Sequence, residues 1–191
     1  AHYKAGVAYS RFNKKRKAIK KFEEAIRLNE DFPEAQFNIA WLYQELGEAK
    51  NALQFYNNTI KYDPNNLEAF YNTGEIHESF ERYQMAAKAF REVIRIDPDH
   101  VEAHAKLGRS YAKLNLPEEA LAEFNIALRI NPNLAETYYQ LGNTYGELKR
   151  EKEGLQPLRK AIQLKPGYLK AIYLLGKFNT VLENYFEAIP S

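Results

Sequence analysis

The 191-residue sequence contains no cysteine, and it has only one methionine and one tryptophan. Without cysteine the chain can form neither a disulfide framework nor a thiolate metal site. No apolar run approaches the 18 or so residues that a membrane span needs, and no signal peptide is visible. We therefore expect a soluble protein; its compartment stays open, with the cytoplasm favoured over secretion.

Motifs of known enzyme chemistry are also missing. The sequence has no glycine-rich phosphate loop, no His-Glu-x-x-His and no serine in a nucleophile-elbow context. His100 and His104, with Glu102 between them, could place two nitrogens on one helix face, but no third ligand stands at suitable spacing. The sequence therefore predicts no metal site, no cofactor and no catalytic residue, and we expect that the protein is not an enzyme.

What the sequence does have is a period of 34 residues, shown by Pro64, Pro98, Pro132 and Pro166. A fixed period of this length indicates stacked repeats. Small residues recur at the same spacing at Gly6, Ala40, Gly74, Gly108, Gly142 and Gly176, and aromatic residues recur at Phe22, Tyr56, Phe90 and Phe124. Both halves of each period carry apolar residues at helical spacing, which predicts a helical hairpin closely packed at its small residues.

The fourth period matches a known family pattern at Leu107, Gly108, Tyr111, Ala120, Phe124, Ala127 and Pro132. On these residues the chain resembles the tetratricopeptide repeat family, and the resemblance extends over its whole length. It implies an all-α fold, a right-handed α-solenoid of antiparallel helical hairpins. Departures from the pattern include Thr73 in the leucine column, His77 in the tyrosine column and Glu30 at the first proline position.

The phase of this pattern divides a single solenoid domain into units. These are residues 1–32, 33–66, 67–100, 101–134 and 135–168, with a partial sixth unit at 169–191. The first unit lacks its two opening residues, and Pro190 interrupts the second helix expected in the last one. We therefore expect a fragment of a longer protein.

Charge is unevenly distributed along the repeats. Residues 1–32 carry nine Lys and Arg against four Asp and Glu, whereas residues 33–100 carry six against eleven. The basic residues of the first unit are concentrated at Lys14, Lys15, Arg16, Lys17, Lys20 and Lys21. This cluster is either an anionic-partner patch or a solvated helix face, and the acidic middle makes nucleic acid an unlikely partner.

A binding groove is expected on the inner surface, which in the resembling family is lined by the first helix of each hairpin. Helical geometry places four columns there, on the face opposite the small-residue seam. The predicted groove residues are Glu34, Phe37, Asn38, Trp41, Glu68, Tyr71, Asn72, Glu75, Lys106, Arg109, Tyr139, Gln140, Asn143 and Tyr173.

These residue types favour a protein-protein interaction scaffold. Rigid aromatic side chains are enriched among binding hot spots, and amide side chains can pair with the backbone of a peptide of any sequence. We expect Trp41, Phe37 and Tyr71 to anchor an extended or helical segment of a partner protein, and Asn38 and Asn72 to clamp its backbone. The glutamates favour a basic segment. The alternative is that the aromatic side chains pack into the core and that the amides only face water.

Two further functions remain open from the sequence. Asn38 and Asn72, with Gln140 as a near match, are similar to the asparagine ladder of peptide O-linked N-acetylglucosamine transferases. The chain could therefore be the substrate-recognition arm of a larger enzyme such as a protein O-glycosyltransferase. It could also be a self-assembling structural scaffold, because its incomplete terminal hairpins present apolar faces.

Overall fold

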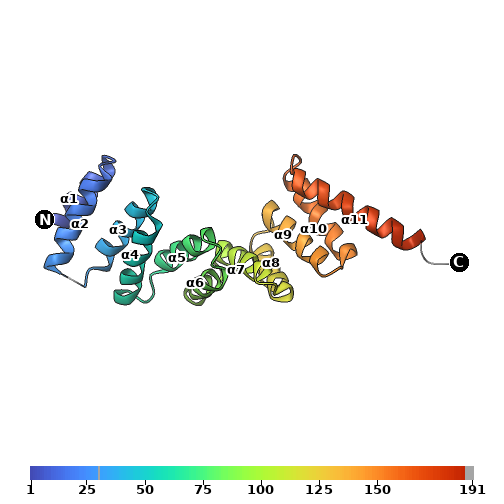
Figure 1. Ribbon diagram of the computed structural model, residues 1–191, viewed down its shortest axis with the longest axis horizontal. Coiled ribbons are helices and arrows are strands. Elements are labelled where there is room, and N and C mark those ends of the chain that lie inside the picture. Colours follow the sequence, from blue (N-terminus) through green and yellow to red (C-terminus); the bar gives the residue numbers. More distant parts are fainter. Residues whose placement is uncertain (30, 188–191) are drawn as a thin grey trace. The chain divides into compact units, whose positions relative to one another are not determined.

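The computed structural model describes residues 1–29 and 31–187, with side chains to residue 183. Helices form this part of the chain, and it contains no strand (Figure 1). They are α1 (His2–Arg11), α2 (Lys15–Leu28), α3 (Pro33–Glu45), α4 (Ala49–Tyr62), α5 (Leu67–Ser79), α6 (Tyr83–Ile96), α7 (Val101–Lys113), α8 (Pro117–Ile130), α9 (Ala135–Glu147), α10 (Glu151–Leu164) and α11 (Leu169–Glu187). The predicted all-α fold class is confirmed. None of these helices combines the length and the apolarity that a membrane span requires.

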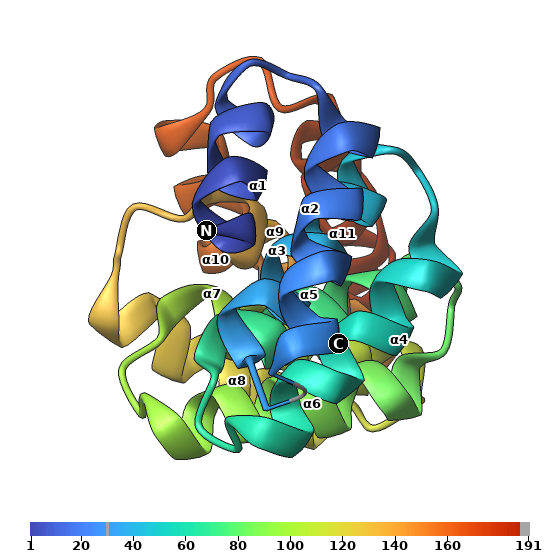
Figure 2. The same cartoon turned by 90° about the vertical axis from the view of Figure 1, so that its left-hand side faces the viewer.

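The helices gather into two compact units, residues Ala1–Ile96 with α1 to α6 and the chain from Asp97 onward with α7 to α11. Within each unit the helices pair as hairpins, and each hairpin packs on its neighbour in the sequence. Figure 2 shows the first hairpin, in which α1 and α2 run in opposite directions.

The small-residue column is the seam at which the two helices of a hairpin meet. A β-carbon added at Gly108 would lie 2.7 Å from Cδ1 of Phe124, and one at Gly74 would lie 2.6 Å from Cε1 of Phe90. These distances are too short for any real β-carbon, so the ring of the second helix occupies the space that the glycine leaves. The first and fifth hairpins repeat this contact with Gly6 and Gly142. Glycine here allows an aromatic ring or a leucine to lie directly against the backbone.

The turn between the helices of each hairpin is also periodic. Residues with positive φ occur 34 positions apart, at Asn13, Gly47, Glu81, Asn115 and Lys149. In the fifth hairpin the Lys149 amide donates to the Gly146 carbonyl at 3.0 Å, and the Arg150 amide donates to the Tyr145 carbonyl at 2.9 Å. This pair of bonds is a Schellman motif, which satisfies carbonyls at the end of the first helix and reverses the chain.

The sixth unit differs from the others. Instead of a first helix, a turn and the beginning of a second, α11 runs without interruption through residues 182–184, where the earlier hairpins turn. No described residue packs on the seam at Gly176, where an added β-carbon would meet nothing within 4 Å. Pro190 and Glu30 lie outside the described residues.

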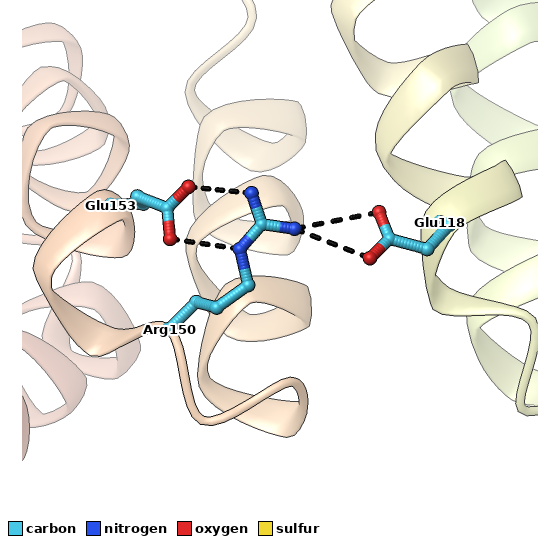
Figure 3. A network of polar contacts seen from close by, with 3 residues as sticks. All are labelled: Glu118, Arg150 and Glu153. Carbon is cyan, nitrogen blue, oxygen red and sulfur yellow. Dashed lines mark hydrogen bonds and ion pairs between the residues drawn. The ribbon is translucent and has the colours of Figure 1, made fainter.

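Ion pairs between residues 32 positions apart connect hairpins that follow one another in the sequence. In the second unit Arg150, at the start of α10, donates to both carboxylate oxygens of Glu153 at 2.5 and 2.8 Å, and to Glu118 of α8 at 3.2 Å (Figure 3). These carboxylates raise the pKa of the Arg150 guanidinium. In the first unit Arg16 pairs with Glu48, at the equivalent two positions but with the charges exchanged. The first and fourth junctions between hairpins therefore form the same contact with the charges exchanged, whereas the equivalent residues of the second and third, Lys50 with Arg82 and Gln84 with Leu116, are not oppositely charged.

Candidate functional site

The predicted groove residues of the first unit lie on α3 and α5. Glu34, Trp41 and Glu68 are exposed, whereas the remaining five are half-buried. Trp41, the only tryptophan of the sequence, leaves 41% of its surface open to solvent. We call the side of these helices that carries Phe37, Asn38, Trp41, Tyr71, Asn72 and Glu75 the α3–α5 face.

Two rings of the α3–α5 face are partly used by the core. Phe37 packs edge-on against the buried Tyr56 of α4, with 5.6 Å between ring centroids, and Tyr71 packs in the same way on the buried Phe90 of α6, at 5.8 Å. Each contact fixes the orientation of its ring. Because both rings are only half-buried, the rest of each ring is open to solvent and forms a rigid part of the α3–α5 face. Trp41 projects further into solvent than either.

The side chain of Asn38 already forms hydrogen bonds within the chain. Its Nδ2 donates to the hydroxyl of Tyr3 on α1 at 3.2 Å and to the carbonyl of Glu34 at 2.7 Å. An amide nitrogen has only two hydrogens, so both are used. A peptide would therefore have to meet Asn38 at the carbonyl oxygen Oδ1, as a hydrogen-bond donor.

Asn72 belongs to a polar network beneath the α3–α5 face. Its side chain hydrogen-bonds to Tyr56, whose fully buried hydroxyl donates to Gln44 Oε1 at 2.8 Å. Burial raises the pKa of the Tyr56 phenol, and the hydrogen bond from Asn72 acts in the opposite direction. Sequence reasoning missed this structural use of Asn72, although a tyrosine within a phenylalanine column was its signal.

A similar network involves the groove residues of the second unit. Gln140 Nε2 donates to Glu136 Oε1 at 2.9 Å, and the hydroxyl of Tyr168 donates to the other oxygen of the same carboxylate. Tyr168 also packs on Tyr139, with 5.1 Å between ring centroids. Burial raises the pKa of Tyr168, and the Glu136 carboxylate raises it further. Gln140 and Tyr139 therefore have structural partners already.

The other predicted residues of the second unit are spread over three helices. Lys106 and Arg109 are half-buried on α7, Asn143 of α9 donates to Glu147 at 2.9 Å, and Tyr173 of α11 is 76% exposed. That these residues and the α3–α5 face line one groove stays a prediction.

The basic cluster of the first unit is partly neutralised by neighbouring carboxylates. Lys15 Nζ lies 3.3 Å from Glu45, Lys21 Nζ lies 2.7 Å from Glu24, and Arg16 pairs with Glu48. Lys14, Lys17 and Lys20 are exposed. Three of the six cations thus stabilise the first two hairpins, which weakens the case for an anionic-partner patch.

The two neighbouring histidines have structural contacts. His104 Nδ1 lies 2.6 Å from Glu123 Oε2, and its Nε2 lies 2.9 Å from the Pro98 carbonyl. His100 caps α7, because its Nδ1 accepts from the Ala103 amide at 3.1 Å. Among the residues that the structure describes, no three metal-ligating side chains gather into one group.

Comparisons with known proteins agree with the repeat architecture. One tetratricopeptide repeat model matches residues 3–59, 44–101 and 81–135, and a second matches residues 135–168. Among solved structures, the chain is similar to YrrB, described as a TPR protein with an unusual peptide-binding site, with a TM-score of 0.84 and 21% identity over 90% of this chain and 89% of that chain. It is also similar to MamA, with a TM-score of 0.79 and 19% identity over 86% and 96% of the two chains.

A further similar structure is MamA 41-end from Desulfovibrio magneticus RS-1, with a TM-score of 0.78 and 18% identity over 87% of this chain and 94% of that chain. At such identities these similarities show the fold alone. No curated protein matches the sequence.

Proposed function

Because the chain belongs to the tetratricopeptide repeat family, we propose that it is a protein-interaction scaffold whose α3–α5 face holds a segment of a partner protein. The exposed Trp41 carries this proposal. Its ring is open to water beside the half-buried ring of Phe37, and tryptophan is among the residue types enriched at binding hot spots. Phe37, held by its contact with Tyr56, gives a partner a rigid neighbouring surface.

Charge defines the class of partner. Helices α3 and α5 contain five glutamates and no lysine or arginine. The exposed Glu34 and Glu68 both lie in the first turn of their helices. An extended segment rich in lysine or arginine complements the negative charge of these two helices. Such complementarity raises the association rate more than it raises the affinity. We propose that backbone N–H groups of such a segment donate to Asn38 Oδ1.

A direct test uses the fluorescence of Trp41, since no other tryptophan contributes to the signal. Peptides would be selected from a random displayed library against the intact chain and then titrated while the emission is recorded. We expect the selected peptides to be basic and to shift the emission. Trp41→Ala should weaken their binding about thirtyfold, which corresponds to about 2 kcal/mol.

Gln54→Ala provides the control, because Gln54 is exposed on α4 and outside the α3–α5 face. Asn38→Ala should weaken binding less than Trp41→Ala does, through one lost acceptor. Selected peptides that leave the emission unchanged and bind the Trp41→Ala chain as well as the original would refute the proposal.

A second candidate function, self-assembly, is favoured by the apolar face of α11. Leu169, Ile172 and Tyr173 are 77%, 43% and 76% exposed, and they share one side of the helix with the uncovered Gly176. At the other terminal helix, Phe12 is 76% exposed at the end of α1. We propose a second copy of the chain as the occupant, in head-to-tail contact between two different apolar surfaces.

Light scattering over a range of protein concentrations checks this candidate. We expect the mean mass to rise with concentration, and Leu169→Glu combined with Tyr173→Glu should hold it at 22.2 kDa because the charges oppose burial. Lys170→Glu, one residue along the same helix, serves as the control. A chain that stays monomeric throughout has no such function.

A further inference from the structure

The third hairpin departs from the repeat at two positions on one side of α5. Thr73 stands where the second, fourth and fifth hairpins carry Ile39, Leu107 and Leu141, and His77 stands where they carry Tyr43, Tyr111 and Tyr145; the first hairpin has Ala5 and Tyr9 at these positions. The two residues are four apart, so they are neighbours on the helix surface. Compared with those three hairpins, both side chains are shorter and place a polar atom closer to the backbone of the helix.

These polar atoms lack partners. Thr73 Oγ1 and His77 Nδ1 are buried and form no hydrogen bond to any residue that the structure describes. By contrast, Thr59 and Thr144 donate to the carbonyl four residues earlier, at 3.0 and 2.9 Å. Buried polar groups are nearly always paired, so two unpaired atoms one helical turn apart require an explanation.

A pocket of about 190 Å³ lies at the same place, between α4, α5 and α6. Thr73 and His77 are both among the residues that line it, and Ile60 of α4, Phe70 of α5 and Met85 of α6 supply apolar walls. Its lining shares no residue with the α3–α5 face. The pocket is therefore a separate site within the first unit.

The volume of the pocket limits the size of the ligand. An apolar cavity of about 150 Å³ binds benzene, so this one is large enough for a six-membered ring with one small substituent.

Charge and hydrogen bonding restrict the ligand further. The lining includes one cation, Lys88, and one anion, Glu92, so it favours neither a positively nor a negatively charged ligand. Burial lowers the pKa of His77, and the charge of Arg82 lowers it further, so the ring is neutral at pH 7. A neutral imidazole can accept through Nδ1, while the threonine hydroxyl can donate.

We propose that this pocket binds a neutral phenolic group, with its ring against Phe70, Ile60 and Met85 and its hydroxyl between His77 Nδ1 and Thr73 Oγ1. Because both atoms are closed to water in this structure, binding requires the Thr73 and His77 side chains to rotate toward the pocket. The ligand hydroxyl then donates to the imidazole and accepts from the threonine. The phenol is either a free small molecule or the tyrosine side chain of a partner, and both present the same chemistry to the pocket.

Met85 makes the test direct, because it is the only methionine of the sequence. Labelling its methyl group with carbon-13 gives a single NMR signal from the pocket wall. The intact chain would be titrated with p-cresol, with toluene as the analogue without the hydroxyl, and with a short glycine-flanked tyrosine peptide. We expect a saturable shift of the signal with p-cresol and at least tenfold weaker binding of toluene.

The matched variant combines Thr73→Leu with His77→Tyr, which restores the residues found at Leu107 and Tyr111 in the next hairpin. We expect it to bind p-cresol at least tenfold more weakly and to unfold at a higher temperature, so that lost binding cannot be due to a lost fold. Binding of the peptide as well as p-cresol would identify a partner tyrosine as the source, and binding of p-cresol alone a small molecule.

Three results would overturn the proposal: no saturable shift with p-cresol, equal binding of toluene, or unchanged p-cresol binding by the double variant. The first would show that the pocket takes no phenol, the second that the polar atoms do not recognise it, and the third that the ligand binds elsewhere.

Discussion

Tyr56 occupies a column in which Phe22, Phe90 and Phe124 are the other aromatic residues. Its ring fills the same buried place between two helices, and only its hydroxyl is additional. Gln44 of α3 and Asn72 of α5 provide the two hydrogen bonds that this hydroxyl needs. A single atom thus connects three helices and, through Phe37 on the same ring, supports the α3–α5 face from below.

We expect Tyr56→Phe to lower the free energy of unfolding by about 1 kcal/mol, because the ring still fits while Gln44 and Asn72 lose their partner. Urea unfolding followed by circular dichroism measures this change. Gln44→Ala should then cost less in the Tyr56→Phe background than in the original chain. A higher urea midpoint for Tyr56→Phe would show that the network does not stabilise the fold.

At the scale of the element, the turn inside each hairpin is the most regular feature of the chain. Its positive-φ position is held by three residues whose types tolerate this conformation, Asn13, Gly47 and Asn115, and by two whose types do not, Glu81 and Lys149. The Schellman hydrogen bonds and the packing of both helices impose the conformation on the latter pair.

Two substitutions within the first unit should therefore have opposite effects. Glu81→Gly removes the steric strain of a β-carbon at φ 57° and should raise the free energy of unfolding by about 0.5–1 kcal/mol. This gain exceeds the cost of the greater backbone entropy that glycine gives the unfolded chain. Gly47→Ala introduces a β-carbon at φ 74° and should lower it by a similar amount. Both positions are exposed, and a β-carbon at Gly47 meets no neighbour within 4 Å.

Thermal and urea unfolding of the two variants provide the check. Because neither site loses a packing contact, any difference between them arises from the backbone conformation. Changes of the same sign in both variants would contradict this interpretation.

The hairpins could be predicted from the sequence because the residues that make the same packing contacts recur in each repeat. The contact of Gly108 with Phe124, for example, follows from a column of small residues and a column of aromatic residues that lie about half a period apart. The continuity of α11 could not be predicted in this way, because a turn in this fold depends on a second helix to pack against. The structural use of Asn72 escaped prediction because it depends on a hydroxyl of another helix.

For the whole molecule, the division after Ile96 separates three hairpins with their own hydrophobic clusters from the rest of the chain. One cluster is formed around Phe22 and Ile39, and another around Tyr56 and Ile76. Three stacked repeats are about the minimum that buries a continuous core. The first unit should therefore contain all the contacts that it needs to fold.

We expect a fragment of residues 1–96 to be helical and to unfold cooperatively, as measured by circular dichroism during heating. A fragment of residues 1–82 serves as the comparison, since it lacks α6 and so removes Phe90 from the seam at Gly74. It should melt at a lower temperature. A disordered 1–96 fragment would mean that the first unit depends on the remainder of the chain.

The neighbour-to-neighbour packing of the hairpins has a consequence for how the protein is made. A chain in which helices contact mainly those next to them in sequence has short loops to close, and such chains fold rapidly. During synthesis, α1 and α2 can pair over Gly6 and Phe22 as soon as both have left the ribosome. Within each unit, each later hairpin then adds to a surface that already exists, so the apolar edge of the growing unit is exposed for only one repeat at a time.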